Sequence, residues 1–493
     1  MVAHAADKVL LIALDAADAE LVEGWIADGS LPNLAGLRGR GAYGRLETAS
    51  AGLSGATWPT FYTGALPPRH GRYHFLQWDS ERMSYRRPTA GSIPLTPFWR
   101  EIAAPERRVL VIDPPSTYTP EPIDGIEIVG FAAHDHLHAP ASYPAGVLRD
   151  VVRRFGRPRL GPEVYSSSGA VGLRDTLLAS TEQLAGMAEN LIENETWSLC
   201  LVCFTATHRA GHRLWSARES GRGDAPSEAV KQVYAACDEA VGRLLAAAGS
   251  GVTCLVFALH GMRSNTSRVD VLESMLDRVL GDAGAKPRPL GASRNLRRLF
   301  PEAARSYWKS RLPLPLQDRL SSRRRTSRID WRRRRAFSLI SDLHGYVRLN
   351  IRGRERDGIV EAGAEADELA HEVAESLATF VDADSGQRVV DRVVRVAELF
   401  GEGPRASLLP DLIVRWSASA AVHRAIESPQ YGRVEWPTPG AHPTGRSGNH
   451  RDGGFLIAAG KRFEPAGIVT GMSTLDLKST VYSLLGIDDD SSS

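Results

Sequence analysis

The sequence predicts an α/β fold with a mostly parallel central sheet, helices on both faces of that sheet and an inserted cap. Short, continuous apolar runs recur along the chain, each suited to one buried strand, and helix-like segments separate several of them. The 493 residues are 43% hydrophobic and 24% charged, which suits a large folded core and neither a disordered nor a fibrous chain.

The apolar runs give the expected strands in chain order. The first, KVLLIALDA (8–16), ends in Asp15, and a helical pattern and the capped helix SLPNLAGLRGRG (30–41) follow it. Further strands are expected at RVLVIDPP (108–115), IEIVGF (126–131), SLCLVCF (198–204), VTCLVFAL (252–259), DLIVRW (411–416) and GFLIAAG (454–460).

The composition and pattern of the sequence change between residues 263 and 404. This stretch contains the arginine-dense run SSRRRTSRIDWRRRRAF (321–337), an expected strand pair in GYVRLNIRGRERDGIV (345–360) and an amphipathic helix in AEADELAHEVAESLATF (364–380). We interpret 263–404 as a cap inserted into a core made of 1–262 and 405–493. The arginine run is interpreted as a solvated connector rather than a nucleic-acid site, because only Trp331 interleaves with it and the whole chain carries a net charge of +2.

Composition also limits cell location and cysteine chemistry. No apolar run approaches the length that crosses a bilayer, so we expect a cytoplasmic protein. Four cysteines are too few for a disulfide framework, and Cys200 and Cys203 should point to opposite faces of one strand.

Polar side chains follow several of the expected strands. Asp15, the pair His208 and His212, and His260 come just after strands, and His450 lies in a glycine-rich loop before the last strand. In parallel sheets functional groups gather at the carboxyl ends of the strands. His208 and His212 are four residues apart and share a helical face, and neutral imidazole suits zinc. A metal site is therefore predicted, with polar strand-to-helix junctions as the alternative.

A nucleophile is expected beside this site. Ser54 and Thr57 lie just before TWPTFYTG, which is compatible with a helix, and free N–H groups at a helix start favour an oxyanion. Capping of that helix is the alternative role for either hydroxyl.

The ordered set of motifs resembles the type I phosphodiesterase/nucleotide pyrophosphatase branch of the alkaline phosphatase superfamily over nearly the whole chain. The motifs are LIALDAAD, LPNLAGLRGRGA, SGATWPTFYTGALPPRHGRYHF, FTATHRAGHRLW, FALHGM, GYVRLNIRGRERDGIV, PDLIVRW and GNHRDGGFLIAAG. The resemblance implies an alkaline-phosphatase-like three-layer sandwich and two metal ions, usually zinc, around a Ser or Thr nucleophile that is transiently phosphorylated. The family nucleophile lies nine residues before the Thr of the TG pair, which selects Ser54, with Thr57 as the fallback.

The resemblance also implies metal ligands. His212 and His450 match one metal site, and Asp15, Ser54 and His260 match the other. Two family aspartates are absent, because His208 and Leu259 stand in their places. The first site then becomes His208, His212 and His450, three neutral ligands of the kind that catalytic zinc accepts.

Three interpretations follow from these departures. The enzyme works with one metal or an unusual pair; or one of the unmatched groups Asp18, His134, His136, His442 and Asp452 replaces a lost carboxylate; or catalysis has been lost and the protein binds a ligand or partner. We expect a hydrolase of phosphodiester, pyrophosphate or phosphomonoester bonds that uses one or two divalent ions, zinc first. A sulfatase or a phosphotransferase is the alternative enzyme activity. The expected partner is a small phosphorylated or sulfated substrate and not nucleic acid, and the sequence indicates no oligomeric state.

Overall fold

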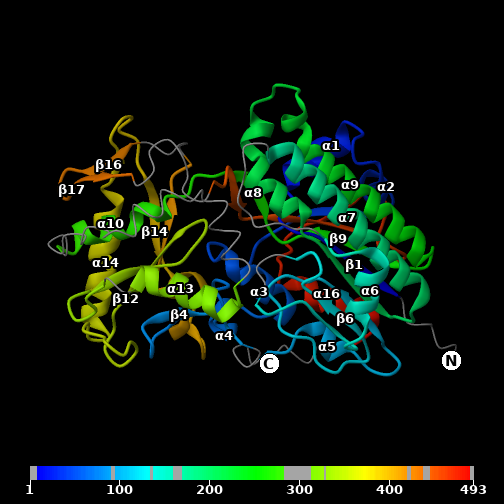
Figure 1. Cartoon of the computed structure of the whole chain (residues 1–493), viewed down its shortest axis with the longest axis horizontal. Coiled ribbons are helices and arrows are strands. Elements are labelled where there is room, and N and C mark those ends of the chain that lie inside the picture. The colour runs from blue at the N-terminus through cyan, green and yellow to red at the C-terminus, as the bar shows by residue number, and fades with distance from the viewer. Residues whose placement is uncertain are drawn as a thin grey trace.

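The computed structural model of the chain consists of two parts that lie side by side, a large core and a smaller second domain (Figure 1). The structure describes residues 8–89, 95–133, 137–158, 169–281, 312–326, 329–418, 424–436 and 445–488. No helix within these ranges is long and apolar enough to cross a membrane.

The core is built on a nine-stranded sheet with the order β20-β2-β19-β9-β1-β8-β5-β6-β7. Its strands are β1 (Val9–Leu14), β2 (Ala42–Leu46), β5 (Val109–Ile112), β6 (Gly125–Val129), β7 (Ala141–Tyr143), β8 (Leu199–Phe204), β9 (Thr253–Ala258), β19 (Gly454–Ala459) and β20 (Gly467–Val469). Strands β9, β1, β8, β5 and β6 are parallel, whereas β19 and β7 are antiparallel to their neighbours. The mostly parallel sheet is therefore confirmed.

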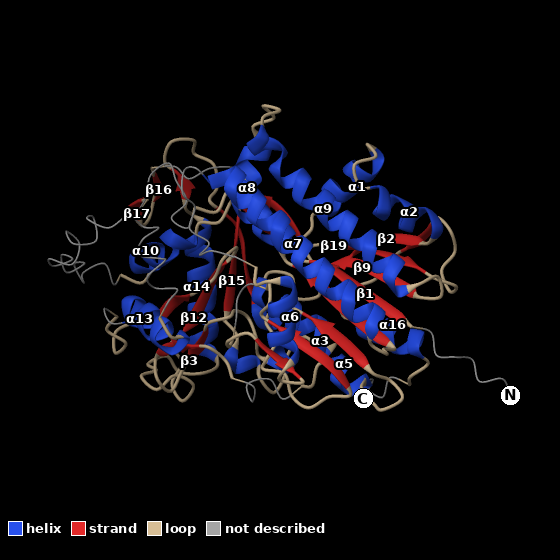
Figure 2. Cartoon of the chain, turned by 45° about the vertical axis from the view of Figure 1, so that its right-hand side comes forward, coloured by secondary structure: helices blue, strands red, loops and turns tan. Residues whose placement is uncertain are grey.

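Helices cover both faces of this sheet, as Figure 2 shows. One layer contains α1 (Ala19–Ala27), α2 (Pro32–Arg40), α6 (Val147–Phe155), α7 (Gly169–Asn194), α8 (Ala206–Glu219) and α9 (Ala225–Ala248). The other contains α3 (Thr57–Thr63), α5 (Phe98–Ile102) and α16 (Asp476–Leu485). Because strand side chains alternate, Cys200 joins the first layer and Cys203 the second, and both cysteines are free.

The second domain contains two antiparallel sheets. The larger has the order β11-β12-β15-β14 and the smaller β13-β16-β17. Their strands are β11 (Ala336–Leu339), β12 (Gly345–Leu349), β13 (Val381–Asp382), β14 (Val390–Arg395), β15 (Leu412–Trp416), β16 (Ala425–Ser428) and β17 (Gly432–Glu435), and the helices are α10 (Val269–Val279), α13 (Leu314–Thr326), α14 (Ala364–Ala378) and α15 (Val396–Phe400). The amphipathic helix expected at 364–380 is confirmed by α14.

Two expectations for this region are wrong. The run DLIVRW, expected in the core sheet, is β15 and pairs with β12 and β14, so a division at residue 404 falls inside one sheet. The expected strand pair at 345–360 is a single strand, β12, whose partners are β11 and β15. A buried apolar run indicates a strand but not the sheet that strand joins.

Short elements connect the two parts. The hairpin of β3 (Gln77–Asp79) and β4 (Ser84–Arg86) follows α4 (Pro67–His70), and β10 (Gly261–Ser264) pairs with β18 (Gly448–Arg451). An apolar cluster crosses the junction and includes Leu53, Tyr73 and Trp78 from the core together with Phe337 and Tyr346 from the second domain. The loop that carries Leu53 and Ser54 therefore packs directly against the second domain.

Candidate metal centre and nucleophile

The topology brings the predicted histidines to one edge of the core sheet. His208 and His212 lie on α8 just after β8, His260 follows β9, and β18 delivers His450 opposite Met262. Close packing of α8 on β10 and β18 depends on two glycines. A Cβ at Gly448 would lie 2.1 Å from the Gly211 carbonyl oxygen, and a Cβ at Gly211 would lie 2.6 Å from the Met262 side chain.

Three of these imidazoles converge on a common point. His208, His260 and His450 each offer one ligand nitrogen, and these nitrogens lie within 4.8 Å of one another. His212 flanks the group, with its ring centroid 4.6 Å from that of His208 and 4.8 Å from that of His450. The structure thus groups His260 with His208 and His450, where the sequence placed His260 with the other metal.

Hydrogen bonds orient the rings of the two α8 histidines. His212 donates through Nδ1 to the Gly448 carbonyl at 2.9 Å, and its Nε2 is buried without a hydrogen-bond partner in the described part of the chain. His208 donates through Nδ1 to Oδ2 of Asp15 at 2.8 Å, and Oδ1 of Asp15 accepts from Trp58 Nε1 at 3.0 Å. A carboxylate that fixes one imidazole nitrogen leaves the other available to a metal.

Two of the buried histidines, His212 and His450, are held in the neutral form. Burial lowers the pKa of His212 well below its usual value, and the positive charge of Arg446 adds to this effect. Burial also lowers the pKa of His450, with a further contribution from His260. Nδ1 of His450 is buried without a hydrogen-bond partner among the described residues. Neutral imidazoles with unused buried nitrogens fit a transition metal such as zinc.

Neither described candidate for the missing carboxylates joins this group. Asp18 caps α1 through Oδ1 and pairs with Arg451 at 3.1 Å through Oδ2. Asp452 accepts a hydrogen bond from Gly52 at 3.3 Å and lies 3.7 Å from Arg415. His134, His136 and His442 lie outside the described residues.

The side chain of Leu259 contributes only packing at the position where the resemblance implies a second aspartate. Its side chain is 2% exposed and belongs to the apolar cluster that includes Trp58 and Phe257. Its carbonyl oxygen accepts a hydrogen bond from Thr48 at 2.7 Å.

The structure also reveals an acid that the sequence did not indicate, Asp342. It precedes β12 in the second domain, and its carboxylate lies 3.3 Å from Nε2 of His74 and 3.1 Å from Arg446. Burial alone would raise the pKa of Asp342, but Arg446 and His74 outweigh burial and lower it, and His450 is a further charge partner. In the sequence, Asp342 is marked only by the dipeptide SD (341–342), two residues before His344, and this stretch does not follow an expected core strand.

The two candidate nucleophiles have different surroundings. Ser54 is half-buried in the 3₁₀ turn η1 (Ser54–Ala56), which precedes α3. Burial raises the pKa of Tyr346, and a hydrogen bond with Ser54 opposes this rise. Thr57, the first residue of α3, is 1% exposed, and its hydroxyl lies 3.1 Å from that of Ser50. Neither hydroxyl caps α3, whose N-cap is Ala56 without a side-chain hydrogen bond. The more accessible hydroxyl is that of Ser54, and Trp58 of the adjoining helix contacts Asp15.

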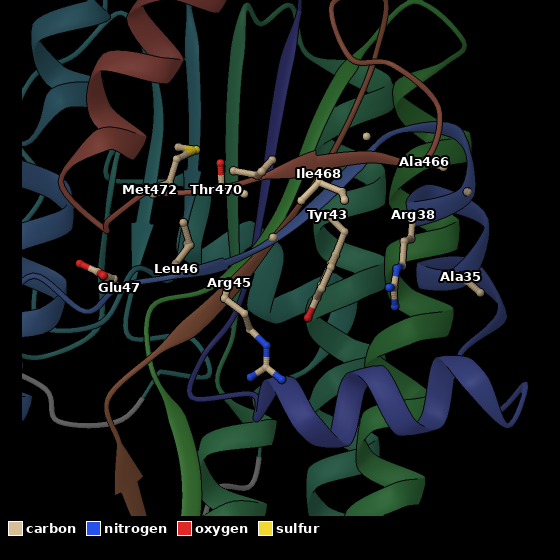
Figure 3. A pocket seen from close by; sticks show the side chains of 15 residues that line it. Ala35, Arg38, Tyr43, Arg45, Leu46, Glu47, Ala466, Ile468, Thr470 and Met472 are labelled. Atoms are coloured by element: carbon tan, nitrogen blue, oxygen red, sulfur yellow. The ribbon is translucent and has the colours of Figure 1, made fainter.

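A cavity of about 880 Å³ lies at another edge of the sheet, beside β2 and β20 (Figure 3). Arg38, Tyr43 and Arg45 line it on one side and Ile468 and Met472 on the other. It contains no candidate metal ligand or nucleophile, so its size gives it no role in the chemistry at the histidines.

Comparison with known proteins assigns the chain to a family. The model of type I phosphodiesterase / nucleotide pyrophosphatase matches residues 9–429. The chain belongs to this family. Its fold is similar to that of phosphonoacetate hydrolase from Sinorhizobium meliloti 1021 in complex with phosphonoacetate, at 12% identity and a TM-score of 0.53 over 98% of this chain and 96% of that chain.

A second solved structure covers a similar share of the chain. Human ectonucleotide pyrophosphatase/phosphodiesterase 5 matches at 12% identity and a TM-score of 0.47 over 98% of this chain and 95% of that chain. No curated protein matches the sequence. The predicted type I phosphodiesterase/nucleotide pyrophosphatase resemblance and the alkaline-phosphatase-like α/β architecture are thus both confirmed.

Proposed function

We propose that this member of the type I phosphodiesterase/nucleotide pyrophosphatase family is a metal-dependent hydrolase of phosphodiester, pyrophosphate or phosphomonoester bonds, with Ser54 as nucleophile. The observation that carries the proposal is the convergence of His208, His260 and His450 on one point. Family membership supplies the reaction class.

The residues around the histidines determine which group the site can hold. Zinc binds imidazole nitrogens at about 2.0–2.1 Å, so tetrahedral ligands are about 3.4 Å apart, and the three rings need to approach by roughly 1 Å. His212, whose Nε2 is unused, can serve as a fourth donor or hold a water. A bound zinc ion would supply charge stabilisation for phosphate oxygens and a lowered pKa for water.

The protein's own groups carry out the covalent step. The Ser54 oxygen attacks phosphorus, an Oγ–P bond forms, the bond from phosphorus to the leaving oxygen breaks, and the Ser54 proton passes to that leaving oxygen. Water then cleaves the Oγ–P bond of the phosphoserine: its oxygen joins the released phosphate and one of its protons restores the Ser54 hydroxyl. Tyr346, which donates to the Gly52 carbonyl at 3.0 Å and contacts Ser54, holds this loop in place.

We infer that one ion, rather than two, is the resident metal. Two divalent ions carry four positive charges, and Asp15 is the matched aspartate that is left to offset them. Both oxygens of Asp15 accept hydrogen bonds, from His208 and Trp58. Leu259 offers no ligand atom, so a second ion has few donors at this position.

The test combines metal analysis with substrate profiling. Purified protein should contain about one transition-metal equivalent and hydrolyse bis-p-nitrophenyl phosphate or p-nitrophenyl phosphate. Ser54→Ala should lower kcat by at least about a thousandfold, because the attacking group is removed. Thr57→Ser, which keeps a hydroxyl at the neighbouring position, should retain most activity. Undiminished turnover in Ser54→Ala would show that Ser54 is not the nucleophile.

A non-catalytic role is the second candidate, and the missing carboxylates at positions 208 and 259 favour it. A folded protein without metal and without turnover on any of these substrates would support that role. Turnover of p-nitrophenyl sulfate or transfer of phosphate to an added alcohol would instead indicate the sulfatase or phosphotransferase variant.

A further inference from the structure

Arg72 is a buried cation without a counter-ion in the described structure. It follows α4 and Gly71, its side chain is 1% exposed, and none of its three guanidinium nitrogens has a hydrogen-bond partner among the described residues. Burial of an unpaired charge is strongly unfavourable, and buried arginines are normally held by carboxylates or carbonyl oxygens. Arg348 shows the usual pattern, because Glu355 and the carbonyl groups of Ser407 and Leu409 surround its guanidinium.

The groups that interact with Arg72 include the hydroxyl of Tyr118, beside which a further cation lies. The hydroxyl of Tyr118 is buried and also lacks a well-aligned hydrogen bond. Burial raises the pKa of Tyr118, and the nearby Arg72 opposes this rise through its charge and a poorly aligned side-chain hydrogen bond. Arg405 is a second positive charge near this hydroxyl. The pKa of His70 falls to about 3 through burial and the charge of Arg72, so this ring is neutral.

Two neighbouring cavities border this cluster. One, of about 690 Å³, is lined by Tyr118 and by the arginines at 86, 87, 319 and 323. The other, of about 290 Å³, is lined by Gly71 and Arg405, and the two share Arg86 and Thr89. Asp318, the acid in these linings, accepts hydrogen bonds from Arg87 at 3.0 and 3.1 Å. These linings are predominantly basic and reach Tyr118 and Arg405, the neighbours of Arg72, although Arg72 itself lines neither cavity.

The cavities lie where the core meets the second domain. Helix α13 packs on β4, α4 contacts the 3₁₀ turn η4 (Ala406–Leu408), and Figure 1 shows α4, β4 and α13 together at this junction. None of the candidate metal ligands and neither candidate nucleophile lines either cavity.

We propose that Arg72 and the Tyr118 hydroxyl, with Arg405 beside them, form a binding site for a compact oxyanion, a phosphate or sulfate group, that is separate from the metal centre. A planar guanidinium presents several N–H donors to such a group, and a phenol adds one more. The bound anion supplies the negative charge that Arg72 otherwise lacks. The ligand is either a free ion or a second phosphate on the substrate.

The first experiment measures Tm of the metal-loaded full chain against sodium sulfate, with inorganic phosphate as a second titrant. The wild type should show a saturable rise of roughly 3 °C at about 100 times Kd. Arg72→Met should abolish the saturable rise, and Tyr118→Phe should weaken binding about tenfold. Without sulfate, Arg72→Met should be at least as stable as the wild type, whereas Arg348→Met, which removes a fully paired guanidinium, should lower Tm.

The outcomes separate this proposal from the proposed function. His450→Ala should keep the sulfate response while it loses metal. A saturable rise that persists in Arg72→Met, or that disappears only in His450→Ala, would overturn the anion site. If Arg72→Met folds poorly, Arg72→Lys and Tyr118→Phe carry the same test, and an unchanged Kd in both would also overturn it.

The source of the oxyanion is decided by kinetics. If the anion is part of the substrate, Arg72→Met should raise KM for a nucleoside triphosphate about tenfold or more but not for bis-p-nitrophenyl phosphate. If it is a free ion, KM should change for neither substrate while sulfate binding is lost.

Discussion

Replacement of Leu259 by aspartate would return a carboxylate to the position where the family carries one. The side chain of Leu259 points from the end of β9 into the apolar cluster of Trp58 and Phe257 and is 2% exposed. Asp15, at the end of the neighbouring strand β1, contacts Trp58 at 3.0 Å. An aspartate at 259 would therefore face the region of Asp15, which the family resemblance implies as a ligand of a second ion.

The cost of this change without metal follows from burial. Truncation of a buried leucine to alanine costs about 2–5 kcal/mol. The aspartate variant has the same packing loss and also buries an unsatisfied carboxylate, which costs about 1–3 kcal/mol more. Leu259→Asp should thus be less stable than Leu259→Ala in a chelator. Binding of a second zinc ion to the folded state at about 1,000 times its Kd should contribute about 4 kcal/mol in Leu259→Asp alone.

Urea unfolding with and without zinc, together with metal analysis, measures both parts of this prediction. Leu259→Asp should hold about two metal equivalents and gain more stability from zinc than the wild type or Leu259→Ala. If both variants show the same zinc increment and the same metal content, position 259 does not face the metal centre.

Two further predictions follow from the structure. His450→Ala should lose stoichiometric metal, because a converging ligand is removed. His212→Ala should weaken metal affinity by only about 10–100-fold, as expected for a flanking side chain. Equal losses of affinity in a competition titration would show that His212 is a direct ligand. Burial raises the pKa of Asp113 to about 6, above the unfolded value of about 3.9, so its protonated form contributes stability at about pH 4 that is lost as pH rises through 6. The free energy of unfolding should fall by about 2 kcal/mol between about pH 4 and pH 6, and Asp113→Asn, compared with the wild type by urea titration at each pH, should lack this component.

The central strands were predictable because their sequences are continuous apolar runs. β1, β5, β6, β8, β9 and β19 each coincide with such a run. The edge strands β7 and β20, and β2 next to β20, are short or carry polar and exposed residues, such as Ile468 at 83% exposure, and resemble loops in sequence. The assignment of β15 to the core was wrong because strands buried in either domain have the same apolar character.

The site residues were predictable as individual residues, but their grouping was not. Asp15, His208 and His260 follow from the rule that parallel strands end at one edge. The association of His260 with His450 depends on the pairing of β10 with β18, which no local pattern specifies. Asp342 reaches the same region from the second domain, and its role depends on how the domains pack.

The two departures from the family pattern are physically linked. An imidazole at position 208 reaches Asp15 at 2.8 Å, so the carboxylate that would bind an ion becomes the hydrogen-bond partner of a histidine. Once Asp15 is engaged in this way, an aspartate at 259 would, without a second ion, be a buried charge with little to pair with, and leucine is the more stable choice there. Conversely, Nε2 of His212 and Nδ1 of His450 are buried without partners among the described residues. Each such atom costs about 1–3 kcal/mol if nothing binds it, which apolar side chains would avoid. Retention of these imidazoles beside an apolar residue at 259 favours a centre specialised for one ion over one that has lost its metal.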